Sequence, residues 1–496
     1  MHTTHKANLK TIAGGSFWVC IGLILTYVLE YTNRVIIGRL FGPSDYGLIA
    51  LALSISILCA SLSLLGLQTG ITRYVAIAPQ LGHKVGEVII SGLKVFLPVS
   101  LLCSTVLLLN RGRIINYFSD SPFVSPLITI FILLIPLIAI ADYFYSCLRG
   151  LKLARQAILS REVALRLVVL TVLIVMALFN IKRLILVPVA YVIGFSLCVI
   201  MLGMGIKRHI SLPEALSTGS FKTKELILFS LPLLFSFFLK RFGGQMCNIL
   251  VGFFRNTTEV GYISAALAFS RLVRFPLNAV QFMFLPVMSE YWHQGKHEEL
   301  KIIFTRLSNW LFCLSGFIFV LFVLNAKLII AMTFGEKFLP AYRALVVLSA
   351  GQFFNTICGP MGSLLLATGD SKRFFIGDFF SLIIALLLYV VITPGFGFLG
   401  AAYVTMFYLV LLKSIYLAFA YRTFKINPFN KKTLSALAFI GLLILFVNNF
   451  FSEAALWGRI LLPAAMYLFI IVATGLLEKD SLTLLKGYFK DTFNKR

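Results

Sequence analysis

Apolar stretches long enough to cross a lipid bilayer recur along the whole chain. Of the 496 residues, 59% are hydrophobic and only 13% are charged. A helix needs about 20 apolar residues to cross the ~30 Å hydrocarbon core. The sequence therefore predicts an all-α polytopic membrane protein with about fourteen transmembrane helices. The predicted spans are 14–37, 44–70, 86–109, 122–147, 163–180, 184–206, 226–252, 258–287, 305–325, 341–367, 374–392, 396–420, 433–450 and 456–477.

Charge is distributed along the chain as expected for a membrane protein, and it does not indicate a nucleic-acid partner. The formal net charge is +25. With the N-terminus inside, Lys and Arg concentrate in the cytoplasmic segments. We interpret Arg149, Lys152, Arg155 and Arg161 as such a topology signal beside anionic lipid. An even number of spans places both termini in the cytoplasm, and the first span is read as a retained helix. The cysteines form no C-x-x-C pair, so we expect no metal site.

Two short motifs indicate an internal repeat. GRLFGPSDYG, with Asp45 two residues before Gly47, matches GFFRNTTEVG, with Glu259 two residues before Gly261. Each motif joins the first two spans of a six-span unit. The repeat predicts two six-helix lobes related by a pseudo-two-fold axis along the membrane normal. The predicted parts are an N-terminal lobe at 1–206, a cytoplasmic linker at 207–225, a C-terminal lobe at 226–422, two added transmembrane helices within 423–478 and a basic amphipathic cytoplasmic tail at 479–496.

Four cations near the middle of the seventh and eighth spans are the strongest functional signal. They are Lys240, Arg241, Arg271 and Arg274. A cation at mid-depth costs at least ~2.5–3.5 kcal/mol, so such groups mark a substrate or ion path. Arg suits bidentate phosphate contacts and Lys supplies a point charge. We expect these four to bind an anionic cargo; the alternative is pairing with carbonyls or snorkelling.

Local spacing refines the roles of these charged residues. Arg271 and Arg274 are three apart and share a helix face, and Pro276 predicts a kink immediately after them. In the first span, Glu30 and Arg34 stand four apart, which predicts a local ion pair. The sharper hypothesis adds Arg34 to the anion site and gives Glu30 a part in proton or cation coupling, because an intramembrane acid can change its protonation.

Neutral polar side chains on the same spans are candidate contacts for sugar. For the amides, hydrogen bonding between helices is the alternative. These residues are Tyr27, Tyr31, Asn33, Gln245, Asn248, Asn278 and Gln281.

The segment IIGRLFGPSDYGLIALALSISILCASLSLLGLQTGITRYVA resembles the first hairpin of polysaccharide flippases. These are the O-antigen (Wzx-type) transporters of the multidrug/oligosaccharidyl-lipid/polysaccharide exporter superfamily. EVGYISAALAFSRLVRFPLNAVQFMFLPVMSEYWHQGKHEELK and SLLLATGDSKRFFIGDFFSLIIALLLYVVITPGFGFLGAAYVT fit the same family. The resemblance implies alternating access around a central cavity lined by spans 1, 2, 7 and 8. It implies no cofactor and no enzymatic reaction.

The cargo implied by this resemblance is a glycan on an undecaprenyl diphosphate carrier. It would move from the inner to the outer leaflet of the bacterial cytoplasmic (inner) membrane, for lipopolysaccharide O-antigen or another surface polysaccharide. The implied partners are this lipid-linked glycan, the bilayer and polysaccharide polymerase or chain-length proteins. Related lipid II flippases carry cavity arginines largely in the first lobe. Here we expect only Arg34 at comparable depth in that lobe, which argues against lipid II as cargo.

Two other functions are weighed against this one. A drug or organic-cation antiporter of the same superfamily needs acids at mid-depth, whereas this chain places cations there. A membrane glycan polymerase or ligase would be expected to carry a long external loop, which this sequence does not offer.

Overall fold

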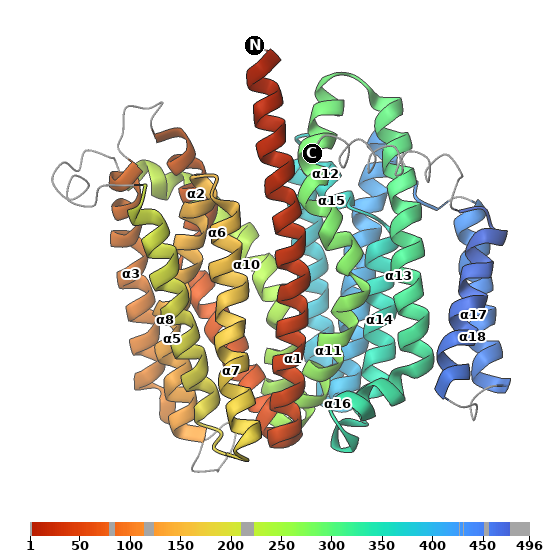
Figure 1. The fold of residues 1–496 in the computed structure, drawn as a ribbon, viewed down its shortest axis with the longest axis horizontal. Coiled ribbons are helices and arrows are strands. Elements are labelled where there is room, and N and C mark those ends of the chain that lie inside the picture. The colour runs from red at the N-terminus through yellow and green to blue at the C-terminus, as the bar shows by residue number, and fades with distance from the viewer. Residues whose placement is uncertain are drawn as a thin grey trace. The chain divides into compact units, whose positions relative to one another are not determined.

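A computed structural model describes residues 2–78, 85–113, 124–209, 223–425, 427–429, 431–450 and 456–476. Every regular element in these ranges is a helix, so the all-α prediction is confirmed (Figure 1). Within this part of the chain, 8 helices are long and apolar enough to cross a membrane. Each predicted span overlaps helical residues. The chain groups into two compact units, 1–264 and 265–496.

The first unit is a bundle in which α3, α5, α7 and α8 run alongside one another, with α5 packed against α8 and α3 (Figure 1). Its helices are α1 (His2–Ser63), α2 (Leu67–Ile77), α3 (Val85–Leu109), α5 (Val124–Gly150), α6 (Ala154–Ile158), the π-helix η2 (Leu159–Ala164), α7 (Leu165–Leu178), α8 (Leu186–Lys207), α10 (Thr223–Phe254) and the first part of α11 (Thr257–Val273).

The first predicted span and most of the second lie within one element, α1, and are separated at Gly42; the end of the second span reaches α2. Gly42 has φ 81° and ψ −177°, which breaks the helix, and Pro43 follows it. Only glycine adopts this backbone conformation readily. In the second unit, Gly397 divides α16 in the same way, with φ 59° and ψ −147°. A glycine with a positive φ therefore separates two successive predicted spans in each unit, Gly42 in the first and Gly397 in the second.

The two repeat motifs pack against each other inside the first unit, and the contact is reciprocal. A Cβ atom placed on Gly47 would lie 1.8 Å from the carbonyl oxygen of Thr257. One placed on Gly261 would lie 2.0 Å from the carbonyl oxygen of Pro43. Thr257 stands in the second motif where Pro43 stands in the first, so each motif glycine contacts the same position of the other motif. This symmetry supports the predicted repeat.

The assignment of α10 differs from the predicted lobe boundary. The first compact unit includes α10, because that helix packs on α1 and α2. The approach to α2 is close: a Cβ atom on Gly66 would lie 2.3 Å from the carbonyl oxygen of Ser230. Most of the predicted linker at 207–225 and the whole tail at 479–496 lie outside the described residues. The boundaries proposed for the lobes stay a prediction.

The second unit contains α12 to α18. Its helices are the remainder of α11, α12 (Phe275–His293), α13 (His297–Thr333), the short η3 (Glu336–Phe338), α14 (Ala341–Ile357), α15 (Met361–Ala367), α16 (Ser371–Phe424), α17 (Lys431–Phe450) and α18 (Leu456–Ala473). The last two helices pair with each other and pack on α13. Tyr467 of α18 anchors this contact by donating to the carbonyl oxygen of Cys313 at 2.9 Å.

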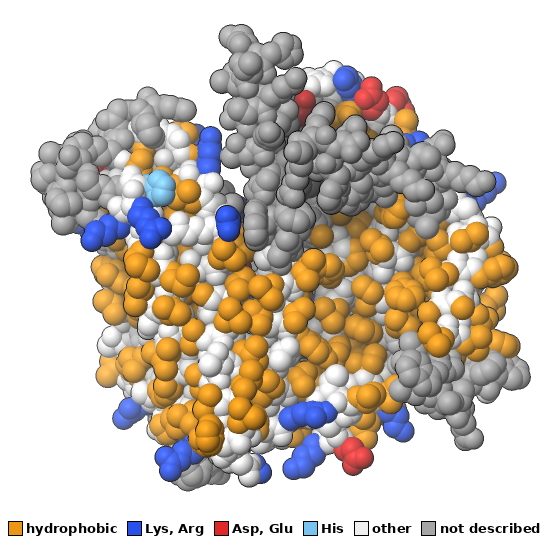
Figure 2. Space-filling model, viewed as in Figure 1, with side chains coloured by type: hydrophobic (Ala, Val, Ile, Leu, Met, Phe, Trp, Pro, Cys, Tyr) orange, Lys and Arg blue, Asp and Glu red, His pale blue; other side chains and the backbone are white. Residues whose placement is uncertain are grey.

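Large apolar side chains point outward along the middle of the helices. Leu101 and Val106 of α3 are 51% and 48% exposed, and Leu387 and Val391 of α16 are 63% and 75% exposed. Figure 2 shows hydrophobic side chains over this middle region, with Lys and Arg gathered toward the helix ends. Such a surface is stable in lipid and not in water. The chain is therefore a multi-pass membrane protein.

Candidate functional site: a buried ion-pair network

Asp142 lies between two arginines in the first unit. Its Oδ1 accepts hydrogen bonds from Nε of Arg161 at 2.9 Å and from Nη2 at 2.8 Å. Its Oδ2 lies 3.4 Å from Nη2 of Arg241. The carboxylate belongs to α5, and the two guanidinium groups belong to η2 and α10. One acidic side chain thus joins three helices.

Glu30 of α1 also lies between two arginines, one on its own helix and one on α7. Its Oε1 accepts from Nη2 of Arg34 at 2.7 Å, and its Oε2 accepts from Nη2 of Arg166 at 3.1 Å. Arg166 also donates to Oε2 of Glu162 at 2.8 Å. The predicted pair of Glu30 and Arg34 is confirmed. It belongs to a longer alternation of positive and negative side chains.

The π-helix η2 brings these two groups of charges together. Arg161 bonds Asp142, and the next residue, Glu162, bonds Arg166. A π-helix is wider than an α-helix because its hydrogen bonds span five residues, and such segments occur often at functional sites. Here the widened turn lets Arg161 and Arg166 bond carboxylates on different helices, α5 and α1.

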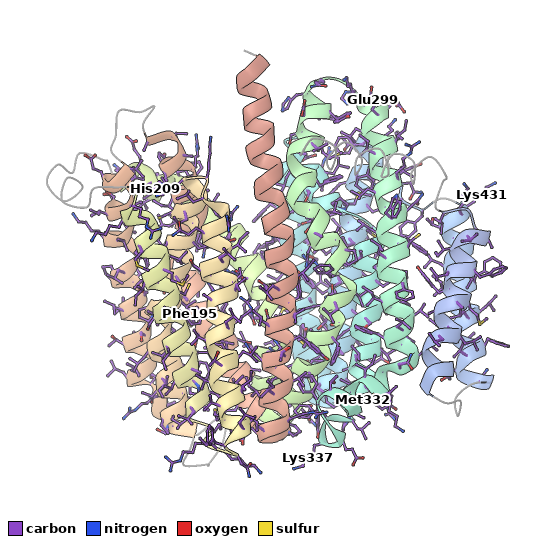
Figure 3. All side chains as sticks on the ribbon, in the orientation of Figure 1. Phe195, His209, Glu299, Met332, Lys337 and Lys431 are labelled. Carbon is purple, nitrogen blue, oxygen red and sulfur yellow. The ribbon has the colours of Figure 1, made fainter. Side chains whose placement is uncertain are left out.

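Arg161 lies far from either end of the bundle. Its guanidinium carbon is 5.0 Å from the ring centre of Phe195, which supplies a cation–π contact. Phe195 is nine residues after the start of α8, or roughly 14 Å along it. Figure 3 shows Phe195 midway along α8 and well separated from His209 beyond its end. The ion pair with Asp142 therefore lies deep in the membrane-spanning region.

The network carries more positive than negative charge. Among the described residues, its ion pairs join four arginines (Arg34, Arg161, Arg166 and Arg241) and three carboxylates (Glu30, Asp142 and Glu162). Burial of a charge is tolerated only when a partner and hydrogen bonds compensate for lost hydration. The excess of one positive charge falls beside Arg241, whose side chain is 38% exposed. That end of the network can receive an anion.

Lys240 and Arg241 diverge on α10, as adjacent helical residues must. Arg241 turns toward Asp142, whereas Lys240 is exposed. Both therefore remain candidates for contact with an anionic ligand, and Lys240 supplies a second positive charge next to the network.

The predicted polar contacts on these helices have mixed surroundings. Asn33 is buried and donates to the carbonyl oxygen of Arg166 at 3.0 Å. Asn248 is also buried; it donates to Ser54 at 3.1 Å and accepts from Ser264 at 3.1 Å. For these two amides the structure shows the alternative considered above, in which the side chain joins helices. Three other predicted contacts are half-buried on α1 and α10: Tyr27, Tyr31 and Gln245.

Arg271 and Arg274 belong to the second unit, where both are half-buried. Arg271 lies in the last turn of α11, and Arg274 is the residue before α12. The helix breaks at Arg274, and Pro276 occupies the first turn of α12, so the predicted kink is confirmed as a break. Asn278 and Gln281 follow on α12, half-buried as well. The two arginines stay within one turn, because N–H of Arg274 bonds the carbonyl of Arg271.

Two interpretations drawn from the sequence were wrong. Arg161 is not a topology signal at the surface: its side chain is 14% exposed and bound to Asp142. Arg34 is not the only deep cation among the first six spans, because Arg161 and Arg166 accompany it. Sequence reasoning also missed Asp142 and Glu162. The sequence did carry a signal for Asp142, because an acidic residue inside the apolar span 122–147 indicates a functional or paired group.

Comparisons with known sequences find one family model and one curated relative that match this chain. A family model described as "polysaccharide biosynthesis protein" matches residues 12–292. An uncharacterized membrane protein of Methanocaldococcus jannaschii is 25% identical over 285 residues, which are 54% of this chain and 54% of that protein. The chain thus spans about half the length of this curated relative.

Solved structures of transporters share the fold. The lipid II flippase MurJ in an inward closed conformation is similar with a TM-score of 0.70 and 16% identity, over 93% of this chain and 99% of that one. An inward-facing multidrug resistance MATE family transporter gives 0.66 and 13%, over 81% and 94%. A MOP superfamily transporter from Pyrococcus furiosus, described as having a binding pocket of reverse polarity, gives 0.56 and 14%, over 84% and 96%. At these identities the likeness concerns the fold.

Proposed function

Because this chain belongs to the polysaccharide biosynthesis protein family, we propose that it is a flippase for a lipid-linked oligosaccharide. The cargo is a glycan on an undecaprenyl diphosphate carrier, moved from the inner to the outer leaflet of a bacterial cytoplasmic membrane. The product supplies assembly of a surface polysaccharide such as O-antigen. Both termini lie in the cytoplasm in this proposal, and polymerase or chain-length proteins act downstream.

The observation that carries the proposal is the excess positive charge of the ion-pair network. Each carboxylate of the network is already bound to arginine: Glu30 and Asp142 to two each, and Glu162 to one. Arg241 extends beyond them with a partly exposed guanidinium group. An anionic linkage such as a diphosphate complements this arrangement, because charge-assisted bonds from Arg to phosphate are short and strong.

In the proposed mechanism, Arg241 and Lys240 bind the diphosphate, and Arg34 contributes positive potential from α1. In the second unit, Arg271 and Arg274 are proposed separately as residues that bind an anionic cargo. Sugar contacts are proposed for Tyr27, Tyr31 and Gln245 in the first unit and, separately, for Asn278 and Gln281 in the second. Alternating access moves the loaded site from one membrane face to the other, and Glu30 takes part in ion coupling. No cofactor is required, since no covalent bond changes.

A drug or organic-cation antiporter is the second candidate function. It is considered because the fold is similar to that of a MATE family transporter. A cationic cargo needs a carboxylate that it can neutralise. Glu30 and Asp142 would first have to leave two arginines each, and breaking a buried pair costs about 3–5 kcal/mol. The geometry therefore favours an anionic cargo. A glycan polymerase is favoured by none of these contacts.

A gene deletion complemented with variants tests the proposal. Loss of the protein should abolish surface glycan and leave carrier-linked glycan in the inner leaflet, and wild type should reverse both. Arg241→Ala should lower the rate of glycan export about tenfold, because a charge-assisted hydrogen bond contributes roughly 1.5–3 kcal/mol. Lys182→Ala, which removes an exposed cation outside the network, should export normally. Full surface glycan in the deletion strain would refute the flippase proposal.

A further inference from the structure

Asp142 bonds its two arginines very unequally. Both bonds from Arg161 reach Oδ1, at 2.8 and 2.9 Å. Arg241 approaches Oδ2 at 3.4 Å. Charge-assisted N–H···O bonds are usually about 2.7–2.9 Å long, so the pair with Arg161 is tight and the pair with Arg241 is loose.

Burial follows the same division. The side chains of Asp142 and Arg161 are 11% and 14% exposed, whereas that of Arg241 is 38% exposed. Arg161 is also held against the ring of Phe195 at 5.0 Å. Arg241 has a longer and weaker ring contact, 6.0 Å from Phe237 on its own helix. A ligand can therefore reach Arg241 without disturbing the inner pair.

From this asymmetry we propose that Asp142 is the exchangeable counter-ion of Arg241. In the empty transporter, Oδ2 of Asp142 holds the guanidinium group. When an anionic headgroup arrives, its phosphate oxygens replace Oδ2, and Asp142 stays charged and bonded to Arg161. The inference rests on the proposed function, because it presumes an anionic cargo.

Two energetic arguments support the exchange. A lone cation at mid-depth costs at least ~2.5–3.5 kcal/mol, so an empty carrier needs an internal anion beside Arg241. A diphosphate carries more negative charge than one carboxylate and binds Arg bidentately, so it displaces Oδ2 readily. A neutral glycan cannot make this replacement. Asp142 thereby contributes to selectivity for cargo with an anionic linkage, although it need not touch that cargo.

Binding of inorganic diphosphate to the purified full chain in lipid nanodiscs tests the exchange, measured by titration calorimetry. The informative variant is Asp142→Asn with Arg161→Gln, which removes the inner pair together and leaves Arg241 without its competitor. Removing both partners avoids leaving Arg161, which is 14% exposed, buried without its carboxylate; the cation left behind, Arg241, is 38% exposed. We expect this double variant to bind diphosphate about tenfold more tightly than wild type, or ~1.4 kcal/mol. Arg241→Gln added to it should abolish the gain.

Controls make the outcomes distinct. Should the amide pair not fold, Asp142→Ala with Arg161→Met replaces it with apolar side chains and carries the same expectation. Equal or weaker binding by a folded double variant, while wild type binds diphosphate, would overturn the counter-ion role alone. Absence of diphosphate binding by wild type and variants alike would overturn the anionic cargo and the exchange with it. Orthophosphate, titrated in parallel, should bind more weakly if the linkage, and not any phosphate, is recognised.

Discussion

Gly47 lies directly against the backbone of Thr257, with no room for a side chain between them. The equivalent glycine of the second motif, Gly261, meets Pro43 in the same way. Gly47→Ala should therefore lower the free energy of unfolding by about 3 kcal/mol, the upper end for overpacking, because the Cβ atom meets backbone and not a movable side chain. Thermal unfolding of purified protein in detergent measures this effect.

Gly441→Ala is the matched control for that substitution. Gly441 lies exposed inside α17, and a Cβ atom there would meet nothing within 4 Å. Alanine is the better helix former, so this variant should be unchanged or up to ~1 kcal/mol more stable. A Gly47→Ala protein as stable as the Gly441→Ala protein would contradict the close contact between the motifs.

Glu30 and Arg166 should be energetically coupled across α1 and α7. In a double-mutant cycle of Glu30→Gln and Arg166→Gln, we expect a coupling energy of about 1–3 kcal/mol, as for contacting residues of one network. Denaturant-induced unfolding in mixed micelles provides the four stabilities. The exposed pair Glu298 and Lys301 is the reference, since such surface pairs contribute at most ~1 kcal/mol. Equal coupling energies in the two pairs would show that burial does not strengthen the interaction between Glu30 and Arg166.

Deleting one residue of the π-helix should leave the protein folded but slow its transport. Deleting Leu159 shortens η2 by one residue, which favours a continuous α-helix from α6 to α7. We expect folded protein in near-normal yield but at least ~tenfold slower glycan export, since Arg161 then turns away from Asp142. Size-exclusion chromatography and the export assay measure the two properties. Deletion of Leu173, inside the regular helix α7, should instead lower the folded yield. Normal export by the Leu159 deletion would exclude a role for the π-helix.

Tyr467→Phe should loosen α18 from α13. The hydroxyl donates to the carbonyl oxygen of Cys313, and its loss leaves a buried acceptor with one bond fewer. A cost of about 1 kcal/mol is expected, visible as a lower unfolding temperature. Tyr403→Phe, at a tyrosine that is 55% exposed, should have no effect. Indistinguishable stabilities for the two variants would mean that the hydroxyl of Tyr467 is not needed to attach this helix pair.

Hydrophobic length and local spacing were sufficient to predict much of the fold. Apolar segments located the helices, and the pair at i,i+4 correctly joined Glu30 to Arg34. The predicted break between the first two spans falls at Gly42, where the positive φ is a local requirement that glycine meets. These features depend on residues close together in the sequence.

The rest of the candidate site depends on contacts that local patterns do not encode. Arg161 follows a basic stretch, so the sequence suggested a surface charge. Its burial became apparent only once α5 supplied Asp142 as a partner. The π-helix that orients Arg161 has no sequence signature in the periodicity of apolar residues. Asp142 itself was detectable as an acid within an apolar span, but its two partners were not.

The order in which the charged residues of the network are synthesised has a consequence for membrane insertion. Arg34 follows Glu30 by four residues, and Arg161 follows Asp142 by nineteen, which is about 1–4 s of synthesis. These charges can therefore enter the bilayer already neutralised by a near neighbour. Arg241 emerges ninety-nine residues after Asp142, when that carboxylate has its partner. Arg241 is thus the late addition that gives a charge-balanced ion-pair network its net positive charge, and its insertion should depend most on the folding of the helices that precede it.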